Sequence, residues 1–83
     1  MYSEKNTIEE TIKNILSNAS GMENIENSAT LKEDLALDSI SMIYIIFDIE
    51  EAFEIQLDES DMNPNELITV QNVINLVYRY RGE

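Results

Sequence analysis

The chain has 83 residues, so we expect one small domain spanning residues 1–83. Its net charge of −12 should repel the phosphate backbone of nucleic acids and attract basic surfaces of other proteins. Its hydrophobic content of 43% is enough for a single thin core. The sequence holds no cysteine and no histidine, so we expect no catalytic residue, no disulfide and no metal site. Because of the negative charge, nucleic acid is a poor partner.

The first helix is predicted to start at Thr7. Thr7 and Glu10 fit a capping box, in which each side chain bonds the backbone N–H of the other residue. One apolar stripe follows at helical spacing, consisting of Ile8, Ile12, Ile15 and Leu16. The helix is expected to end near Asn18, ahead of Ser20 and Gly21.

Residues 19–38 show no sustained hydrophobic period. A connection of this length is uncommon in a compact domain, and such connections are often functional. Leu31, Leu35 and Leu37 are expected to hold its second half against the core.

The segment Ser39–Phe53 carries the strongest helical pattern. Asp38 or Ser39 can cap its N-terminus, where the helix dipole favours acidic and phosphate groups. The stripe predicted to face the core consists of Met42, Ile45, Ile46, Ile49 and Phe53. A second apolar face, which a small bundle does not need, consists of Ile40, Ile43, Tyr44 and Phe47. This face either docks a partner or, for Ile43 and Phe47, packs under the 19–38 loop.

A short helix is predicted over Pro64–Leu67, with Asn63 as its cap and proline at its first position. The last helix starts after Thr69 and turns Val70, Val73, Ile74 and Val77 inward. It ends near Gly82, with arginines at the negative end of the helix dipole. The predicted fold class is therefore all-α, a small four-helix bundle of three main helices and one short helix.

No segment is long enough to cross a bilayer. The longest apolar run, residues 42–47, is far shorter than a membrane span, and the N-terminus has no signal-peptide pattern. We expect a cytoplasmic protein that is a monomer.

The junction of the long loop and the second helix reads Leu31-x-x-Asp34-Leu35-x-Leu37-Asp38-Ser39-Ile40. Here the sequence resembles the acyl carrier protein family, whose modification site reads Asp-Ser-Leu at the start of the second helix. The resemblance covers nearly the whole chain, including the order of the helices and Thr69-Val70 before the last one. It implies that a phosphopantetheinyl transferase moves 4'-phosphopantetheine from coenzyme A onto the Ser39 hydroxyl. In the family, the aspartate before the serine helps the transferase hold Mg²⁺, and Asp38 matches that position. A swinging arm also needs an exposed anchor, and a phosphodiester is favoured at a helix N-terminus.

In this family, partner enzymes bind the second helix through basic patches. Glu50 and Glu51 match acidic positions of that helix, and Asp48 adds charge nearby. Ser41 and Tyr44 stand where fatty-acid-type carriers usually have acidic residues, so the first turns of the helix are neutral and partly apolar. We therefore expect acyl-loading and acyl-processing enzymes to dock with basic and apolar patches. The expected partner-binding residues are Ile40, Ile43, Tyr44, Phe47, Asp48, Glu50 and Glu51.

Three alternatives compete with an acyl carrier of fatty acid, polyketide or specialised biosynthesis. Peptidyl carriers usually have Gly-x-x-Ser at the modification site and this chain does not, but a discrete aminoacyl or peptidyl-type carrier stays open. An acidic helical adaptor whose Ser39 is never modified also stays open. A calcium-binding EF-hand starting at Asp58 fails, because Met62 and Asn63 occupy positions that need an oxygen ligand and a glycine.

Overall fold

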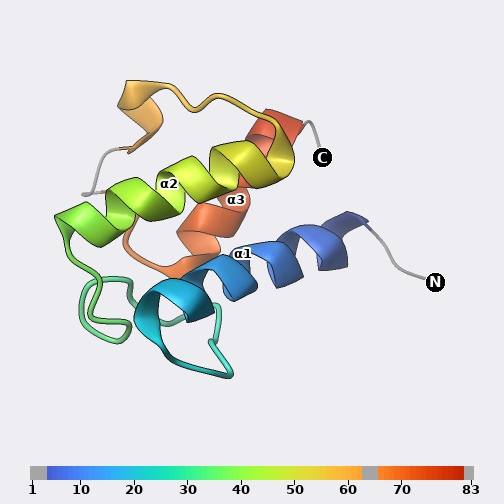
Figure 1. Ribbon diagram of the computed structural model, residues 1–83. Coiled ribbons are helices and arrows are strands. Elements are labelled where there is room, and N and C mark those ends of the chain that lie inside the picture. Colours follow the sequence, from blue (N-terminus) through green and yellow to red (C-terminus); the bar gives the residue numbers. More distant parts are fainter. Residues whose placement is uncertain (1–3, 63–65, 82–83) are drawn as a thin grey trace.

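The computed structural model describes residues 4–62 and 66–81 (Figure 1). Three α-helices and one 3-10 helix follow one another along the chain: α1 (Glu4–Ser20), α2 (Ser39–Phe53), η1 (Glu59–Met62) and α3 (Val70–Arg81). The only β-type pairing in these two ranges is an isolated antiparallel bridge between Thr30 and Thr69. The predicted all-α class and its three main helices are confirmed. No helix of the described part is long and apolar enough to span a membrane.

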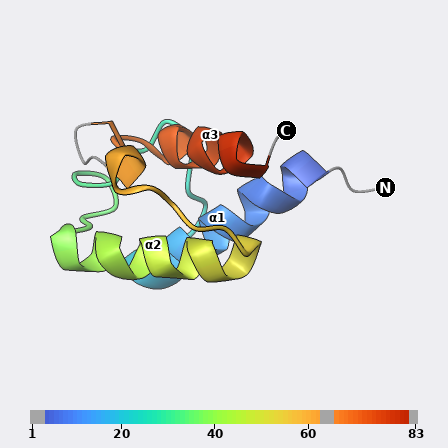
Figure 2. The same cartoon turned by 90° about the horizontal axis from the view of Figure 1, so that it is seen from above.

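One core lies between the three α-helices. α1 packs against both α2 and α3, and α2 and α3 run along the other sides of the core (Figures 1 and 2). Each helix turns its predicted apolar stripe toward the core, and the loop leucines are buried as expected. Ile15, Met42 and Ile46 of these stripes are only partly buried and pack against the edge of the core. The core residues are Ile8, Ile12, Leu16, Ile25, Leu31, Leu35, Leu37, Ile45, Ile49, Phe53, Leu57, Leu67, Val70, Val73, Ile74, Leu76 and Val77.

The ends of α1 differ from the prediction. The helix begins at Glu4, so Thr7 lies inside it and the predicted N-cap at Thr7 is wrong. The residues before Thr7 include glutamate and lysine, which favour helix and extend it by one turn. At the other end the helix continues to Ser20, where Gly21 adopts a left-handed φ of 76° and its N–H donates to the Ser17 carbonyl at 2.8 Å.

The short helical element that the structure describes lies earlier than the predicted one. η1 occupies the acidic turn at Glu59–Met62. Asp58 starts it, because its carboxylate accepts hydrogen bonds from the Ser60 N–H and the Ser60 hydroxyl, both at 3.0 Å. Of the helix predicted over Pro64–Leu67, the first two residues and the predicted cap Asn63 lie outside the described residues. Glu66 lies in a turn, and Leu67 is buried but not helical.

The long connection between α1 and α2 is fixed to the start of α3 by backbone hydrogen bonds. The Leu31 N–H donates to the Ile68 carbonyl at 2.9 Å, and the Val70 N–H donates to the Ala29 carbonyl at 3.0 Å. A third bond joins the Gln71 N–H to the Asn27 carbonyl at 2.9 Å, next to a side-chain bond between the same two residues. The loop therefore forms a wall of the core without a helix of its own.

Ala36 turns the backbone in the last part of this loop. Its φ is 53°, in the left-handed region that alanine rarely adopts. Leu35 and Leu37 on either side of it are both buried, while Ala36 itself is exposed. The turn at Ala36 thus lets two nearly adjacent leucines enter the core and brings Asp38 and Ser39 to the surface.

Candidate functional site

The N-terminus of α2 is capped by Asp38. This residue has an extended backbone (φ −96°, ψ −177°), and its Oδ1 accepts a hydrogen bond from the Ser41 N–H at 2.8 Å. The carbonyl of Asp38 accepts the first helical bond, from the Met42 N–H at 2.9 Å. Of the two caps that the sequence allows, the structure therefore has Asp38, and Ser39 is the first residue of the helix.

Ser39 is exposed at the loop–helix junction. Within the described residues its hydroxyl takes part in no hydrogen bond, so a group attached there replaces no structural contact. The first N–H groups of α2 and the positive end of its dipole lie at the same place, and both favour an anionic phosphodiester. The geometry suits a covalent anchor on the surface.

Asp38 is an anionic neighbour of Ser39. Hydrogen bonds from the Ser41 backbone and then from the Ser41 side chain lower the pKa of the Asp38 carboxyl below its ordinary value of 3.8. Asp38 is therefore ionised at neutral pH. It places a negative charge directly before the exposed hydroxyl of Ser39.

The junction is held in place from the loop side. Thr30 and Asp34 bond each other reciprocally: the Thr30 N–H donates to Asp34 Oδ2 at 2.9 Å, and the Asp34 N–H donates to Thr30 Oγ1 at 3.0 Å. The Leu37 N–H then donates to the Leu31 carbonyl at 3.0 Å. The backbone is thus fixed up to the residue before Asp38, and the chain emerges at the surface from there.

The second apolar face of α2 points to solvent. Its members are exposed to 65% (Ile40), 52% (Ile43), 66% (Tyr44) and 59% (Phe47). The alternative that Ile43 and Phe47 pack under the 19–38 loop is therefore wrong, because the core-facing stripe already fills the other side of the helix. These four residues, which we call the apolar face, lie in the first turns of α2 beside Ser39.

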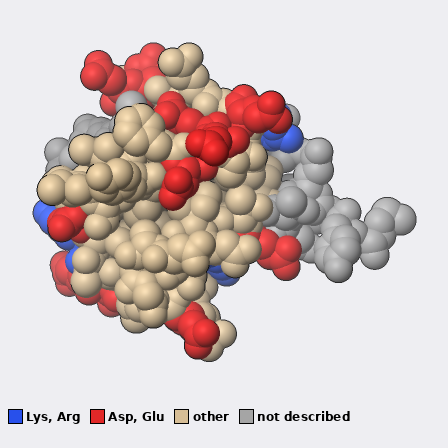
Figure 3. Space-filling view, viewed as in Figure 1, with Lys and Arg blue, Asp and Glu red and all other residues tan. Residues whose placement is uncertain are grey.

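Acidic groups follow the apolar face along the helix. Asp48 and Glu51 are exposed, and no basic residue occurs in α2. Figure 3 shows acidic side chains gathered over the C-terminal half of α2 and the connection after it, while the N-terminal half carries other residue types. Glu50 differs from its neighbours: it is half-buried, and its Oε2 accepts the Leu57 N–H at 2.8 Å. Sequence reasoning missed this internal bond of Glu50.

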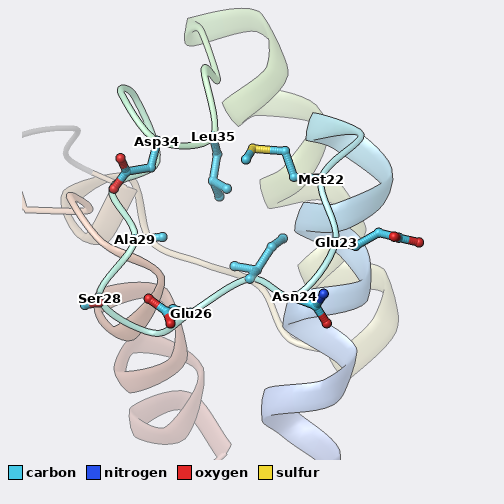
Figure 4. Close-up of a pocket in the computed structure, with 9 residues that line it drawn as sticks. Met22, Glu23, Asn24, Glu26, Ser28, Ala29, Asp34 and Leu35 are labelled. Atoms are coloured by element: carbon cyan, nitrogen blue, oxygen red, sulfur yellow. The ribbon is translucent and has the colours of Figure 1, made fainter.

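A cavity of about 290 Å³ lies in the loop after α1 and not at Ser39. Met22 and Leu35 point toward one another across it, whereas Glu23 points away (Figure 4). The polar side chains of Glu23, Asn24 and Asp34 at its rim point in different directions and do not converge as the groups of a catalytic site do (Figure 4). The described residues also contain no cluster of three or more carboxylates placed to hold a metal ion.

Comparison with known proteins agrees with this geometry. Residues 10–77 match the family model described as "Phosphopantetheine attachment site". The chain is also 36% identical over 74 residues to the acyl carrier protein of Buchnera aphidicola subsp. Schizaphis graminum (strain Sg), an alignment that covers 87% of this chain and 91% of that relative. The chain therefore belongs to the acyl carrier protein family: it is a carrier and not a catalyst, and its prosthetic group is a covalently attached 4'-phosphopantetheine.

Proposed function

We propose that Ser39 bears the 4'-phosphopantetheine arm, and that the protein carries acyl thioesters in fatty acid or related polyketide or specialised biosynthesis in the cytoplasm. The observation that supports this most is the place of Ser39. It is an exposed hydroxyl at the first residue of α2, directly after the ionised cap Asp38. The matched family region, residues 10–77, includes this junction.

The residues at the junction fit the arm. When bound, the arm supplies a terminal thiol that holds the cargo as a thioester; the chain itself has no cysteine that could do so. Ser39 offers the oxygen for the phosphodiester, and the N-terminal N–H groups of α2 offset its negative charge. Asp38 keeps a carboxylate beside the site, where the transferase can use it to position a divalent cation.

Family membership implies a phosphopantetheinyl transferase and acyl enzymes as partners in general. The apolar face (Ile40, Ile43, Tyr44 and Phe47) and the acidic residues Asp48, Glu50 and Glu51 form the docking surface in our proposal. Two features of the structure support this. First, the apolar face is exposed beside Ser39. Second, negative charges near the C-terminus of a helix destabilise that helix, so the acidic residues at the end of α2 are more readily explained by a role in binding. One carboxylate oxygen of Glu50 is already used by Leu57, so Asp48 and Glu51 are the stronger candidates for basic partner groups.

The attachment residue is tested by intact mass after incubation with coenzyme A and a broad-specificity phosphopantetheinyl transferase. We expect the wild-type chain to gain one arm and Ser39→Ala to gain none. Ser41→Ala is the matched control, because it removes a hydroxyl two residues away and keeps the N–H that Asp38 binds; it should still be modified. Modification of Ser39→Ala, or no mass change in wild type with a transferase that modifies another carrier, would refute the proposal. The second result would favour an unmodified adaptor.

An aminoacyl or peptidyl cargo is the second candidate. It is favoured by the neutral first turns of α2, where the exposed Tyr44 stands in place of a charge. The group found on the protein isolated from its host decides between the two: a fatty or polyketide acyl group supports the first candidate, and an amino acid or peptide supports the second.

A further inference from the structure

The connection that follows α2 is held to the rest of the molecule in two different ways. Residues 54–62, here called the strap, start at Glu54 with a left-handed φ of 53° and end with η1. Leu57 is buried near the start of the strap, and its N–H bonds Glu50 of α2 at 2.8 Å. Glu59 and Ser60 in η1 are exposed. The first part of the strap is therefore fixed by the core, and its second part needs other contacts.

The last turn of α3 supplies polar contacts to the strap. The Tyr80 hydroxyl donates to Asp61 Oδ2 at 2.5 Å and accepts the Asp58 N–H at 2.8 Å. Arg79 pairs with the other oxygen of Asp61 at 3.6 Å. Arg81 Nη1 donates to the Phe53 carbonyl at 3.2 Å, at the point where α2 ends. The last turn of α3 thus contacts three points along this connection: Phe53, directly before the strap, Asp58 in its middle and Asp61 near its end.

Tyr80 is the centre of this arrangement because a phenol is both a donor and an acceptor. Its single oxygen joins the residue that precedes η1 to a residue within η1. The hydrogen bond to Asp61, more than any other factor, raises the pKa of Tyr80 above its ordinary value of 10.0, so the phenol is neutral and able to donate at physiological pH. A hydrogen bond to a carboxylate is stronger than one between neutral groups.

The polar atoms of these contacts lie outside the core, although the Tyr80 ring is half-buried and packs against it. The side chains of Arg79 and Asp61 are 68% and 30% exposed, whereas the residues that join α1 to α2 and α3 are buried. Figures 1 and 2 both place η1 beside the N-terminal half of α2, the half that starts at Ser39.

We propose that Tyr80, Asp61 and Arg79 form a latch that holds η1 to α3, and that its release lets residues 58–62 open while Leu57 stays in the core and α1, α2 and α3 stay folded. Local opening of this kind is expected where few buried apolar contacts hold a segment. The latch thereby controls the surface next to the first half of α2. The inference holds whether or not Ser39 carries the arm.

Hydrogen–deuterium exchange read by mass spectrometry tests the latch in the full-length chain. Tyr80→Phe keeps the ring and removes both hydrogen bonds of the hydroxyl. Asp61→Asn removes the negative charge that accepts the Tyr80 hydrogen bond and pairs with Arg79. We expect peptides covering residues 58–62 to exchange about tenfold faster in either variant, the factor that corresponds to one to two net hydrogen bonds. Peptides of α1 should change less than about twofold, because a local opening leaves them protected. Arg79→Gln should give a smaller increase, since exposed ion pairs contribute little.

Tyr44→Phe is the matched control, because it removes the hydroxyl of an exposed tyrosine on α2 and should leave exchange in the strap unchanged. Unchanged exchange of residues 58–62 in both Tyr80→Phe and Asp61→Asn would overturn the proposal. An equal acceleration in all peptides would overturn it as well, since the contacts would then contribute to global stability and not to a separate latch.

Discussion

Ala36 holds a backbone conformation that an L-residue with a side chain disfavours, and replacing it by glycine tests how much this costs the fold. Its φ of 53° lies in the left-handed region, where an alanine costs roughly 1–2 kcal/mol. Ala36→Gly removes that cost but adds conformational freedom to the unfolded chain, which lowers stability by about 0.4–1 kcal/mol. Because the Ala36 side chain is exposed, no buried surface is lost. The net expectation is a gain of about 0.5–1 kcal/mol.

Thermal unfolding of the unmodified protein, followed by circular dichroism, measures this gain. In a domain of this size, about 1 kcal/mol shifts Tm by roughly 4–8 °C, so Ala36→Gly should raise Tm by a few degrees. Ala52→Gly is the matched control, because Ala52 is exposed within α2 and glycine in a helix costs up to about 1 kcal/mol. The same substitution should thus have opposite signs at the two sites. A lower Tm for Ala36→Gly would refute the reasoning that the left-handed turn is strained.

Four further results are expected. Asp38→Ala should lower the urea midpoint through loss of the cap, and Asp38→Asn, which keeps an oxygen acceptor, should lower it less. Because the pKa of Asp38 is lowered on folding, the part of the cap's contribution that depends on the carboxylate charge, which Asp38→Asn lacks, is complete above pH about 3.8 and is lost as the pH falls below it. Glu50→Ala should cost about 1 kcal/mol or more, since it leaves the Leu57 N–H without its acceptor; an unchanged urea midpoint would contradict the bond. The pKa of Tyr80 is raised on folding, so its contribution is complete below pH about 10 and lost at higher pH; the stability difference between wild type and Tyr80→Phe should shrink there. With a net charge of −12, added NaCl should raise Tm, and a flat salt series would contradict this.

The features that could be predicted from the sequence depend on local periodicity. Apolar residues at helical spacing predict α2 and α3 and the faces they bury, because the spacing within one helix is enough to define its apolar face. The exposure of Tyr44 follows from the same argument, since one helix in a small bundle has only one face to bury. For Ile43 and Phe47 the sequence left packing under the 19–38 loop open, and the structure shows that both are exposed. The surface position of Ser39 follows from its place between the leucine-rich loop and the stripe of α2.

The features that were missed depend on contacts between distant residues or on backbone angles. The Tyr80–Asp61 bond joins residues 19 positions apart, and no local pattern marks either partner. Glu50 has the composition of a surface acid, and its bond to Leu57 exists only because the strap folds back over α2. The left-handed angle of Ala36 has no signal because alanine, unlike glycine, does not mark such positions. Asp58 before Ser60 is a turn signal that could have placed η1 correctly.

The backbone bonds between the long loop and the start of α3 also bear on how the molecule folds. They join residues 27–31 to residues 68–71, so about half of the chain must close into a loop before they form. Loop closure costs entropy before the contacts compensate for it. The helices contain mainly local contacts and can form early, whereas this pairing raises the contact order of the protein. Substitutions at Thr30 and Thr69 should therefore reveal whether the pairing belongs to the folding transition state: a slower folding rate places it there, and a faster unfolding rate places it after the barrier.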